Sequence, residues 1–376
     1  MSVDESLLDD PGAVLAADRS ELLRFVATSG AQVREAMTRA DEAGVARLAE
    51  DGRPRSVVVA AAGASRHVGS VLEAVAGASC PVPVLRADGF ALPGWVGPLD
   101  LVVAVGGATP PEETWALADE SARRGCRLLV VAPPEGPLAE AARRARGVHV
   151  PVHRSGRPSR ADLWARAVPL LLAADALGLA SVPMDALERA ADRLDRTAER
   201  CGPAVDPLDN PAKSLALQLI DALPLLWASG DVAAMPARRF ADRIAVDAGL
   251  PAVADELPAA GHAAAALLDG SLRPDEDDFF RDRVEEGGVG RPRVVVVRDA
   301  EEDPRVALRR EQLAQIAADG GVAWSEVVAT PGHPVERLAE LVSVTDFAAT
   351  YLALVHGTDP SRRSTVNELD DRTRRR

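Results

Sequence analysis

A short glycine-containing turn between a predicted strand and a predicted helix most constrains how this chain can fold. Segment 106–114 reads Gly-Gly-Ala-Thr-Pro-Pro-Glu-Glu-Thr, follows the apolar run 101–105 and leads into a helical pattern at 115–124. In α/β proteins, the free backbone N–H groups at such a helix start bind anions. Pro110 and Pro111 have no N–H group to donate. The turn therefore has the position of an anion site but lacks much of its chemistry.

Short apolar segments alternate with amphipathic helical patterns along most of the chain. In the first half, the predicted strands are 56–61, 81–85, 99–105, 127–132 and 148–152. In the second half, the predicted strands are 223–228, 293–297 and 322–328, and the predicted helices are 212–219, 236–248 and 334–354. Such alternation indicates parallel sheets with helices on both faces. We therefore predict an α/β fold with two doubly wound parallel-sheet domains in tandem.

The same pattern divides the chain into four parts. They are a loose acidic lead-in at 1–19, a first α/β domain at 20–155, a helical connector at 156–205 and a second α/β domain at 206–376. The stretch 201–211, with one glycine and three prolines, marks the boundary before the second domain. Ser20 is expected to cap the first helix. The acidic interval 274–286 is expected to be an exposed loop.

The composition indicates the cellular location of the protein and excludes some classes of ligand. The 376 residues carry a formal net charge of −14 and are 47% hydrophobic, so we expect a globular protein without a nucleic-acid surface. The N-terminus has no apolar signal segment, and apolar runs such as 170–174 are too short to span a bilayer. Cys80, Cys126 and Cys201 share no metal or disulfide spacing. We therefore expect free thiols, no membrane association and a cytoplasmic location.

Lys213 is the only lysine among 43 basic residues. A single lysine can survive in an arginine-rich composition by chance or because the fold needs it, and both interpretations stay open. Lys213 stands at a predicted helix start, with Asn210 as the N-cap and Pro211 at the first helical position.

Five short segments occur in a fixed order over nearly the whole chain. They are 57–65 (a strand and a small-residue turn), 92–96 (Leu-Pro-Gly-Trp-Val), 111–114 (Pro-Glu-Glu-Thr), 210–213 (Asn-Pro-Ala-Lys) and 351–360 (Tyr-Leu-Ala to Asp-Pro). This ordered set resembles the sugar isomerase (SIS) fold, and specifically the bifunctional phosphoglucose/phosphomannose isomerase family. The resemblance implies two SIS-type domains, a homodimer and a sugar phosphate as ligand. It implies no cofactor, and the six histidines form no cluster that indicates a metal site.

The family's phosphate loop reads S-G-N-T-E-E-T and binds the anion through hydroxyl and backbone N–H groups. When the two sequences are aligned on Glu-Glu-Thr, its first four residues correspond to Ala108, Thr109, Pro110 and Pro111. Only Thr109 keeps a hydroxyl, so the resemblance implies weakened phosphate binding here.

Other groups could replace the lost donors. The turn Gly63-Ala64-Ser65 offers the Ser65 hydroxyl and backbone donors, with Arg66 beside it, although Ser65 could instead be an ordinary N-cap. The positions that the resemblance assigns to substrate binding are Gly63, Ser65, Arg66, Gly107, Thr109 and Glu113.

The family's proton-shuttling glutamate corresponds to Val246, which cannot move a proton. Asp247 is adjacent, but on a helix its side chain points about 100° away, and it could be a solvated or capping carboxylate. The family's ring-opening histidine corresponds to His262, after a changed spacing, with a generic helix-start histidine as the alternative. The family's C-terminal lysine corresponds to Asp370, where the charge is reversed.

Three functions follow from the resemblance. The first is a sugar-phosphate-binding, catalytically weakened or silent relative, which could act on a partner enzyme of hexose phosphate metabolism. The second is an active aldose–ketose isomerase that interconverts glucose 6-phosphate or mannose 6-phosphate with fructose 6-phosphate. It would use Glu112, Glu113 or Asp247 as base and His262 to open the ring. The third is a structural dimer that binds no phosphosugar.

Overall fold

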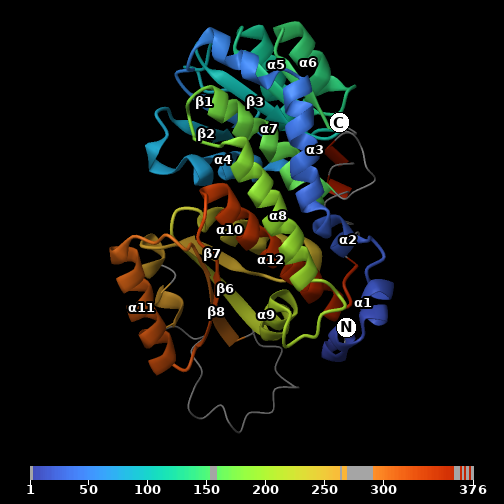
Figure 1. Ribbon diagram of the computed structural model, residues 1–376, viewed down its shortest axis with the longest axis vertical. Helices are drawn as coiled ribbons and strands as arrows, with labels where there is room; N and C mark the ends of the chain where they lie inside the picture. Colours follow the sequence, from blue (N-terminus) through green and yellow to red (C-terminus); the bar gives the residue numbers. More distant parts are fainter. Residues whose placement is uncertain are drawn as a thin grey trace. The chain divides into compact units, whose positions relative to one another are not determined.

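The computed structural model describes residues 3–152, 159–262, 265–268 and 291–359, together with 365, 368, 369, 372 and 373 (Figure 1). The predicted acidic loop 274–286 and Asp370 lie outside the described residues. The chain divides into two compact units. The first-sheet unit contains Thr28–Asp195 and Gly332–Ala339, and the second-sheet unit contains Met1–Ala27, Arg196–Pro331 and Glu340–Arg376.

The first sheet has five parallel strands in the order β2-β1-β3-β4-β5. Their bounds are β1 Val57–Ala60, β2 Val84–Ala87, β3 Leu101–Val105, β4 Arg127–Ala132 and β5 Val148–Pro151. The strands β1, β3 and β4 are almost wholly buried, as expected when helices cover both faces of a parallel sheet. All five strands were predicted, but β2 begins three residues late because Pro81 and Pro83 cannot donate to the ladder.

The side chains of the first sheet alternate between two helical layers. Val58, Val102 and Leu128 pack in one core cluster with Leu117 of α5 (Glu112–Arg123) and with α6 (Pro137–Ala145). Val59 faces the opposite side, where Gly69 of α4 approaches so closely that an added Cβ would lie 3.3 Å from the valine side chain. The helices on this second side are α3 (Ser29–Glu42), α4 (Val68–Ala76) and α7 (Leu163–Ala176).

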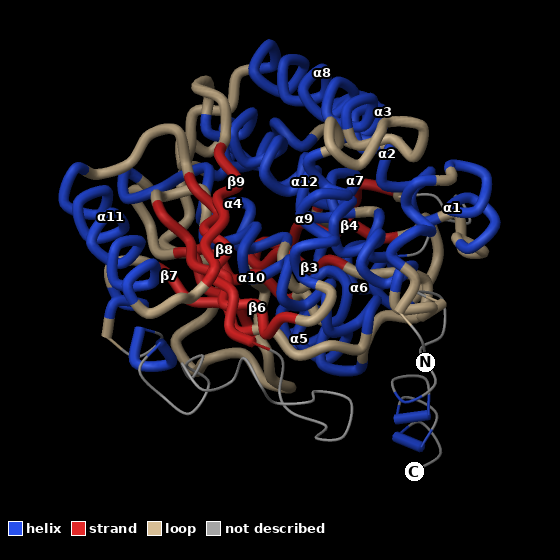
Figure 2. The backbone as a smooth tube through the Cα atoms, turned by 90° about the horizontal axis from the view of Figure 1, so that it is seen from below, coloured by secondary structure: helices blue, strands red, loops and turns tan. Residues whose placement is uncertain are grey.

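The second sheet has four parallel strands in the order β7-β6-β8-β9 (Figure 2, strands in red). Their bounds are β6 Ala222–Ser229, β7 Val253–Glu256, β8 Arg291–Arg298 and β9 Ala323–Val328. The apolar pattern did not predict β7, because this edge strand is four residues long and two of its residues are acidic. The helices of this unit include α9 (Pro211–Leu219), α10 (Ala234–Arg243), its π-helical continuation η6 (Ile244–Ala248) and α11 (Pro304–Asp319).

The N-terminal residues 5–17 are structured, so the expected loose lead-in is wrong for this stretch. They form η1 (Glu5–Asp9) and α1 (Pro11–Ala17), whose Leu8 and Val14 are fully buried. Two apolar side chains in an acidic segment are enough to anchor it to a core. The first turn of α2 (Leu22–Ala27) is also capped differently from the prediction. The backbone N–H groups of Leu22 and Leu23 donate to Asp18, not to Ser20, at 2.9 and 2.8 Å.

The helical prediction for residues 162–200 is confirmed by α7 and by α8 (Met184–Arg200). Most of both helices belongs to the first-sheet unit, and the division between the units falls at Arg196, close to the predicted boundary at 201–211. The predicted limits of the four parts of the chain stay predictions.

The last long helix, α12 (Pro334–Val355), matches its prediction within one residue. In the part of the chain that the structure describes, α12 alone is long and apolar enough to cross a membrane. However, 94% of its most apolar window is buried inside the protein, and a core helix has the same composition.

Candidate functional site

The first sheet has a topological switch point between β1 and β3. After β1 the chain adds β2 on one side of the sheet, and it then returns to add β3 on the other side. Ligands of open α/β sheets bind at the carboxyl ends of the strands at such a point. Here these ends carry the turn η3 (Gly63–Ser65) after β1 and the loop 106–111 after β3. A Cβ added to Gly63 would lie 3.9 Å from the side chain of Pro111, so the two turns are neighbours.

Ser65 is buried and already has a cationic partner. Its Oγ accepts a hydrogen bond from Nη1 of Arg166, which lies on α7 and is itself buried. Nη2 of Arg166 lies 3.5 Å from Oδ2 of Asp162, and burial lowers the pKa of the guanidinium. Ser65 does not cap α4, whose N-cap residue is His67. The Ser65 hydroxyl therefore connects the turn to a buried positive charge. The sequence pattern did not indicate that Arg166 would lie at this site.

The other switch-point residues form a mostly exposed rim. Gly63, Arg66 and Thr109 are exposed, and Gly63 has a φ of 57°, which a glycine adopts without strain. Gly107 and Glu113 are partly buried. The structure thus brings Gly63 and Ser65 on one turn next to the loop that carries Gly107 and Thr109.

The start of α5 keeps part of an anion site. The N–H group of Trp115 donates to the Pro111 carbonyl at 3.2 Å and begins the hydrogen-bond pattern of the helix. The N–H groups of residues 112–114 come before this pattern, so the helix itself offers them no acceptor. The buried Oγ1 of Thr114 has no hydrogen-bond partner among the described residues. Against an anion stand the two carboxylates of Glu112 and Glu113 in this first turn. The site is therefore weaker than an unsubstituted helix start.

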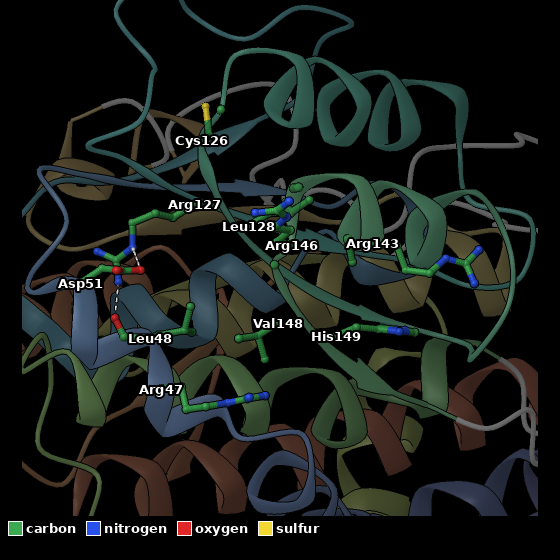
Figure 3. A pocket seen from close by; sticks show the side chains of 14 residues that line it. Arg47, Leu48, Asp51, Cys126, Arg127, Leu128, Arg143, Arg146, Val148 and His149 are labelled. Carbon is green, nitrogen blue, oxygen red and sulfur yellow. Dashed lines mark hydrogen bonds and ion pairs between the residues drawn. The ribbon is translucent and has the colours of Figure 1, made fainter.

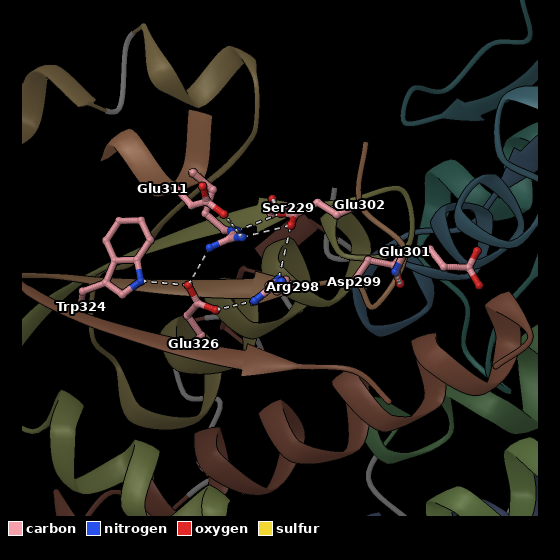
Figure 4. A network of polar contacts seen from close by, with 9 residues as sticks. Ser229, Arg298, Asp299, Glu301, Glu302, Glu311, Trp324 and Glu326 are labelled. Atoms are coloured by element: carbon pink, nitrogen blue, oxygen red, sulfur yellow. Dashed lines mark hydrogen bonds and ion pairs between the residues drawn. The ribbon is translucent and has the colours of Figure 1, made fainter. Parts of the chain in front are cut away.

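The corresponding switch point of the second sheet, between β6 and β8, is filled with carboxylates (Figure 4). Oγ of Ser229 donates to Oε1 of Glu302, which also accepts from Nε of Arg310 at 3.0 Å. Burial alone would raise the pKa of Glu302, but these hydrogen bonds and the nearby guanidinium groups hold it below its usual value. Asp299 is buried and accepts from the N–H groups of Val232 and Glu301. Arg298 and Arg310 at this end are already paired with Glu302 and Glu326, so a phosphate would have to compete with these carboxylates.

The position of the family's base, Val246, lies exposed on η6. Its neighbour Asp247 is fully buried and accepts a hydrogen bond from Nε of Arg243, one turn earlier. The alternative that Asp247 is a solvated or capping carboxylate is therefore wrong. The same cluster contains Asp346, which accepts from Nε and Nη2 of Arg239 at 2.9 and 2.7 Å. Asp247 is thus part of a buried ion-pair cluster.

His262 is exposed and lines a cavity of about 400 Å³ in the second-sheet unit. It follows η7 (Ala259–Gly261) as its C-cap residue, so it is not a helix-start histidine. The cavity is also lined by Asp255 and Glu256 at the carboxyl end of β7, and by Arg238 and Arg309. Nη2 of Arg238 donates to Oε2 of Glu256 at 3.3 Å. His262 therefore shares a cavity with carboxylates, whereas Ser65 and Thr109 belong to the first-sheet unit.

Lys213 has a structural position. It is 1% exposed, and its Nζ donates to the carbonyls of Leu8 and Pro203 at 2.7 and 2.9 Å. Asn210 caps α9 through the N–H groups of Ala212 and Lys213, as predicted. No group of three or more His, Cys, Asp or Glu side chains suited to a metal ion occurs in the described ranges of the chain.

Two parallel, doubly wound sheets with short turns at their switch points place the chain in the class of doubly wound α/β proteins. Residues 208–372 match the model of the bacterial phospho-glucose isomerase C-terminal SIS domain. A bifunctional phosphoglucose/phosphomannose isomerase from Caldicellulosiruptor bescii is 24% identical over 81% of this chain and 85% of that protein. Residues 208–372 are therefore similar to a SIS domain, and most of the chain resembles a bifunctional phosphoglucose/phosphomannose isomerase.

Solved structures agree with this fold. A hypothetical protein from Thermus thermophilus superimposes with a TM-score of 0.68 at 15% identity, over 98% of this chain and 94% of that chain. The tagatose-6-phosphate ketose/aldose isomerase from Escherichia coli superimposes with a TM-score of 0.65 at 14% identity, over 90% and 93% of the two chains. At these identities the likeness concerns the fold alone.

Proposed function

We propose that this chain binds a sugar phosphate and is a catalytically weakened or silent relative of the phosphoglucose/phosphomannose isomerases. The observation that carries the proposal is the state of the base position. Val246 has no proton to exchange, and the adjacent carboxylate of Asp247 is buried in an ion pair with Arg243. Proton transfer between two sugar carbons needs a carboxylate within reach of both carbons, and this arrangement provides none at that position.

The proposed ligand site is the first-sheet switch point. Gly63, Ser65 and Arg66 would meet the phosphate from the turn after β1. Gly107, Thr109 and Glu113 would meet the ligand from the loop after β3 and from the first turn of α5. Two groups extend the set of donors beyond the residues that the sequence indicated: Arg166, behind Ser65, and the hydroxyl of Thr114, which has no partner among the described residues.

The test combines binding with turnover. Calorimetric titrations with fructose 6-phosphate, glucose 6-phosphate and mannose 6-phosphate should show binding, and a coupled assay should show turnover far below the ordinary enzymatic range of about 1–10³ per second. Arg66→Gln should weaken binding about tenfold, whereas Arg24→Gln, the matched exposed control, should not. Turnover within the ordinary range would refute a silent relative. Failure of all three sugars to bind would support the structural dimer without a phosphosugar ligand.

The second candidate function is an active aldose–ketose isomerase. It is favoured by the cavity that His262 shares with Asp255 and Glu256, because a histidine beside carboxylates is suited to proton transfer. If this function is correct, His262→Gln abolishes measurable turnover while binding of fructose 6-phosphate persists. Turnover that survives His262→Gln would exclude this role for His262.

We further propose that the protein is a cytoplasmic homodimer, and that an enzyme of hexose phosphate metabolism is a further partner. The charge of −14 and the three free cysteines support a soluble protein in a reducing compartment. Light scattering at several protein concentrations would test the dimer, and a monomer throughout would contradict it.

A further inference from the structure

The first-sheet unit also contains a polar cavity (Figure 3). It lies near the amino ends of the strands, opposite the ends that form the switch point. Its volume is about 540 Å³, within the range of small-molecule pockets. The cavity lies where β4 begins at Arg127 and β5 begins at Val148, beside η2 (Val45–Asp51) and the end of α6. The proposed sugar-phosphate site lies at the carboxyl ends of the strands, which are at the opposite end of the sheet. The two locations are therefore separate.

Basic side chains dominate the lining of this cavity. They are Arg47, Arg127, Arg143, Arg146 and His149, whereas Asp51 is the acidic residue of the lining. The side chain of Asp51 is 72% exposed and lies 3.8 Å from Nε of Arg127, so it neutralises little of this charge.

The arginines differ in the hydrogen bonds and ion pairs that their guanidinium groups make with the protein. Arg127 donates to the carbonyls of Gly52, at 2.8 Å, and Leu48, which fixes it against η2. Nη2 of Arg47 donates to the Ala43 carbonyl at 3.1 Å. Arg143 pairs with Glu140 on the exposed side of α6. The guanidinium of Arg146 makes no hydrogen bond or ion pair with the residues that the structure describes. Arg146 can therefore bind a ligand without losing a protein partner.

The backbone beside the cavity is tightly packed. A Cβ added to Gly147 would lie only 2.3 Å from the Leu128 carbonyl oxygen, so no larger residue fits between β4 and the start of β5. Arg146, just before it, has a φ of 51°, in the left-handed region that few non-glycine residues adopt. Such backbone strain recurs at ligand sites, and here it carries the one free guanidinium of this set. Leu48, Leu128 and Val148 supply an apolar part of the wall.

We propose that this cavity binds a phosphorylated small molecule with two or more negative charges. Among the described residues, Arg47 and Arg146 have no carboxylate partner, and Arg127 has only the exposed Asp51 at 3.8 Å, so an anion with several charges would compensate these cations. Arginine is suited to this because its planar fork binds phosphate oxygens in pairs. The apolar wall leaves room for an uncharged portion of the ligand. The site does not depend on the sugar-phosphate site at the switch point.

The test uses the full chain with two probes, inorganic pyrophosphate and ATP, in calorimetric titrations. The variant Arg47→Gln/Arg146→Asn removes two cations, and asparagine tolerates the left-handed backbone at position 146. The matched control Arg19→Gln/Arg196→Gln removes two exposed arginines elsewhere. We expect about tenfold weaker binding per arginine, or about a hundredfold for the cavity variant, and no change for the control. If pyrophosphate binds as tightly as ATP, the cavity recognises the phosphate groups alone. If ATP binds more tightly, the apolar wall contacts the nucleoside of ATP.

Hydrogen–deuterium exchange gives the location. With either probe bound, protection is expected at 45–51 and 142–149. Protection confined to 63–66 and 106–111 would place the anion at the switch point and overturn the proposal. So would the absence of binding by both probes at millimolar concentration, or equal weakening in the cavity and control variants. Arg66→Gln should leave pyrophosphate binding unchanged, so failure of the sugar-phosphate site and failure of this cavity can be told apart.

Discussion

Nη1 of Arg166 donates a hydrogen bond to Oγ of Ser65, across the 101 residues that separate them in sequence. This bond joins α7 to the turn after β1. The hydroxyl that the sequence assigns to phosphate binding is thus also part of the support of the switch point. Buried donors that lose their acceptor are costly, so the pair links the stability of the unit to its proposed ligand site.

Ser65→Ala should lower the free energy of unfolding by about 1–3 kcal/mol, because Nη1 of the buried Arg166 loses the acceptor that Ser65 provides. Urea denaturation followed by circular dichroism measures this change. The control is Ser6→Ala, whose hydroxyl bonds to Asp4 on the exposed surface and whose loss should have no measurable effect. Equal stability of the Ser65→Ala and wild-type proteins would show that the Arg166 bond contributes nothing.

Asp346→Asn should be more destabilising, by about 3–5 kcal/mol, because it removes the charge that Arg239 and Arg243 share in a buried cluster. The double variant Arg239→Met/Asp346→Leu should recover part of this loss, since no charge of that pair then stays buried without its partner. Urea denaturation of the three proteins measures the effect. Glu21→Gln, which breaks an exposed ion pair with Arg24, is the control and should change little. A loss for Asp346→Asn no larger than that of the control would contradict the cluster's role.

Much of the fold could be predicted from the sequence, because strand and helix periods are local properties. Apolar runs such as 101–105 and 127–132 became β3 and β4 with few changes at their ends. The exceptions have local causes as well. The strand β7 is short and acidic, and η1 and α1 each bury one apolar residue within an acidic stretch.

The candidate sites were less predictable, because their partners are distant in sequence. Periodicity carries no information on the distance between Ser65 and Arg166, or between Arg47 and Arg146. Those distances are set by the strand order and by which helix covers which face. The signal that could have indicated the basic cavity is a pair of arginines near the starts of neighbouring strands: Arg127 is the first residue of β4, and Arg146 stands two residues before β5. The strand order that makes them neighbours is a property of the folded chain.

Lys213→Met tests whether the fold needs the single lysine or whether the lysine is present by chance. The substitution should cost about 2–4 kcal/mol, because the carbonyls of Leu8 and Pro203 both lose their donor in a buried setting. Urea denaturation provides the measurement, and Leu208→Ala, at a side chain 93% exposed in the same boundary segment, is the control. A cost for Lys213→Met as small as that of the control would favour chance survival.

Cys201 and Tyr351 should make the protein less stable in alkali. Burial raises the pKa of the Cys201 thiol from 9.0 to about 12, and burial also raises the pKa of Tyr351, whose hydroxyl donates to the Cys201 carbonyl at 2.6 Å. In the folded state the thiol keeps its proton, whereas in the unfolded chain it loses it near its ordinary pKa. The free energy of unfolding should therefore fall as pH rises from about 9 toward 12, by up to about 1.4 kcal/mol per pH unit from this thiol.

The measurement is the difference in free energy of unfolding between wild type and Cys201→Ala, from urea titrations at pH values between about 8 and 11. Burial lowers the pKa of Lys213, which works in the opposite direction, but Lys213 and Tyr351 are present in both proteins and cancel in the difference. Any stability advantage of wild type below pH 9 should shrink above it, because only wild type has this buried thiol. In the Cys80→Ala control, which keeps Cys201, stability should fall with pH as in wild type. A difference between wild type and Cys201→Ala that stays constant across this range would show that the folded state does not hold the thiol protonated.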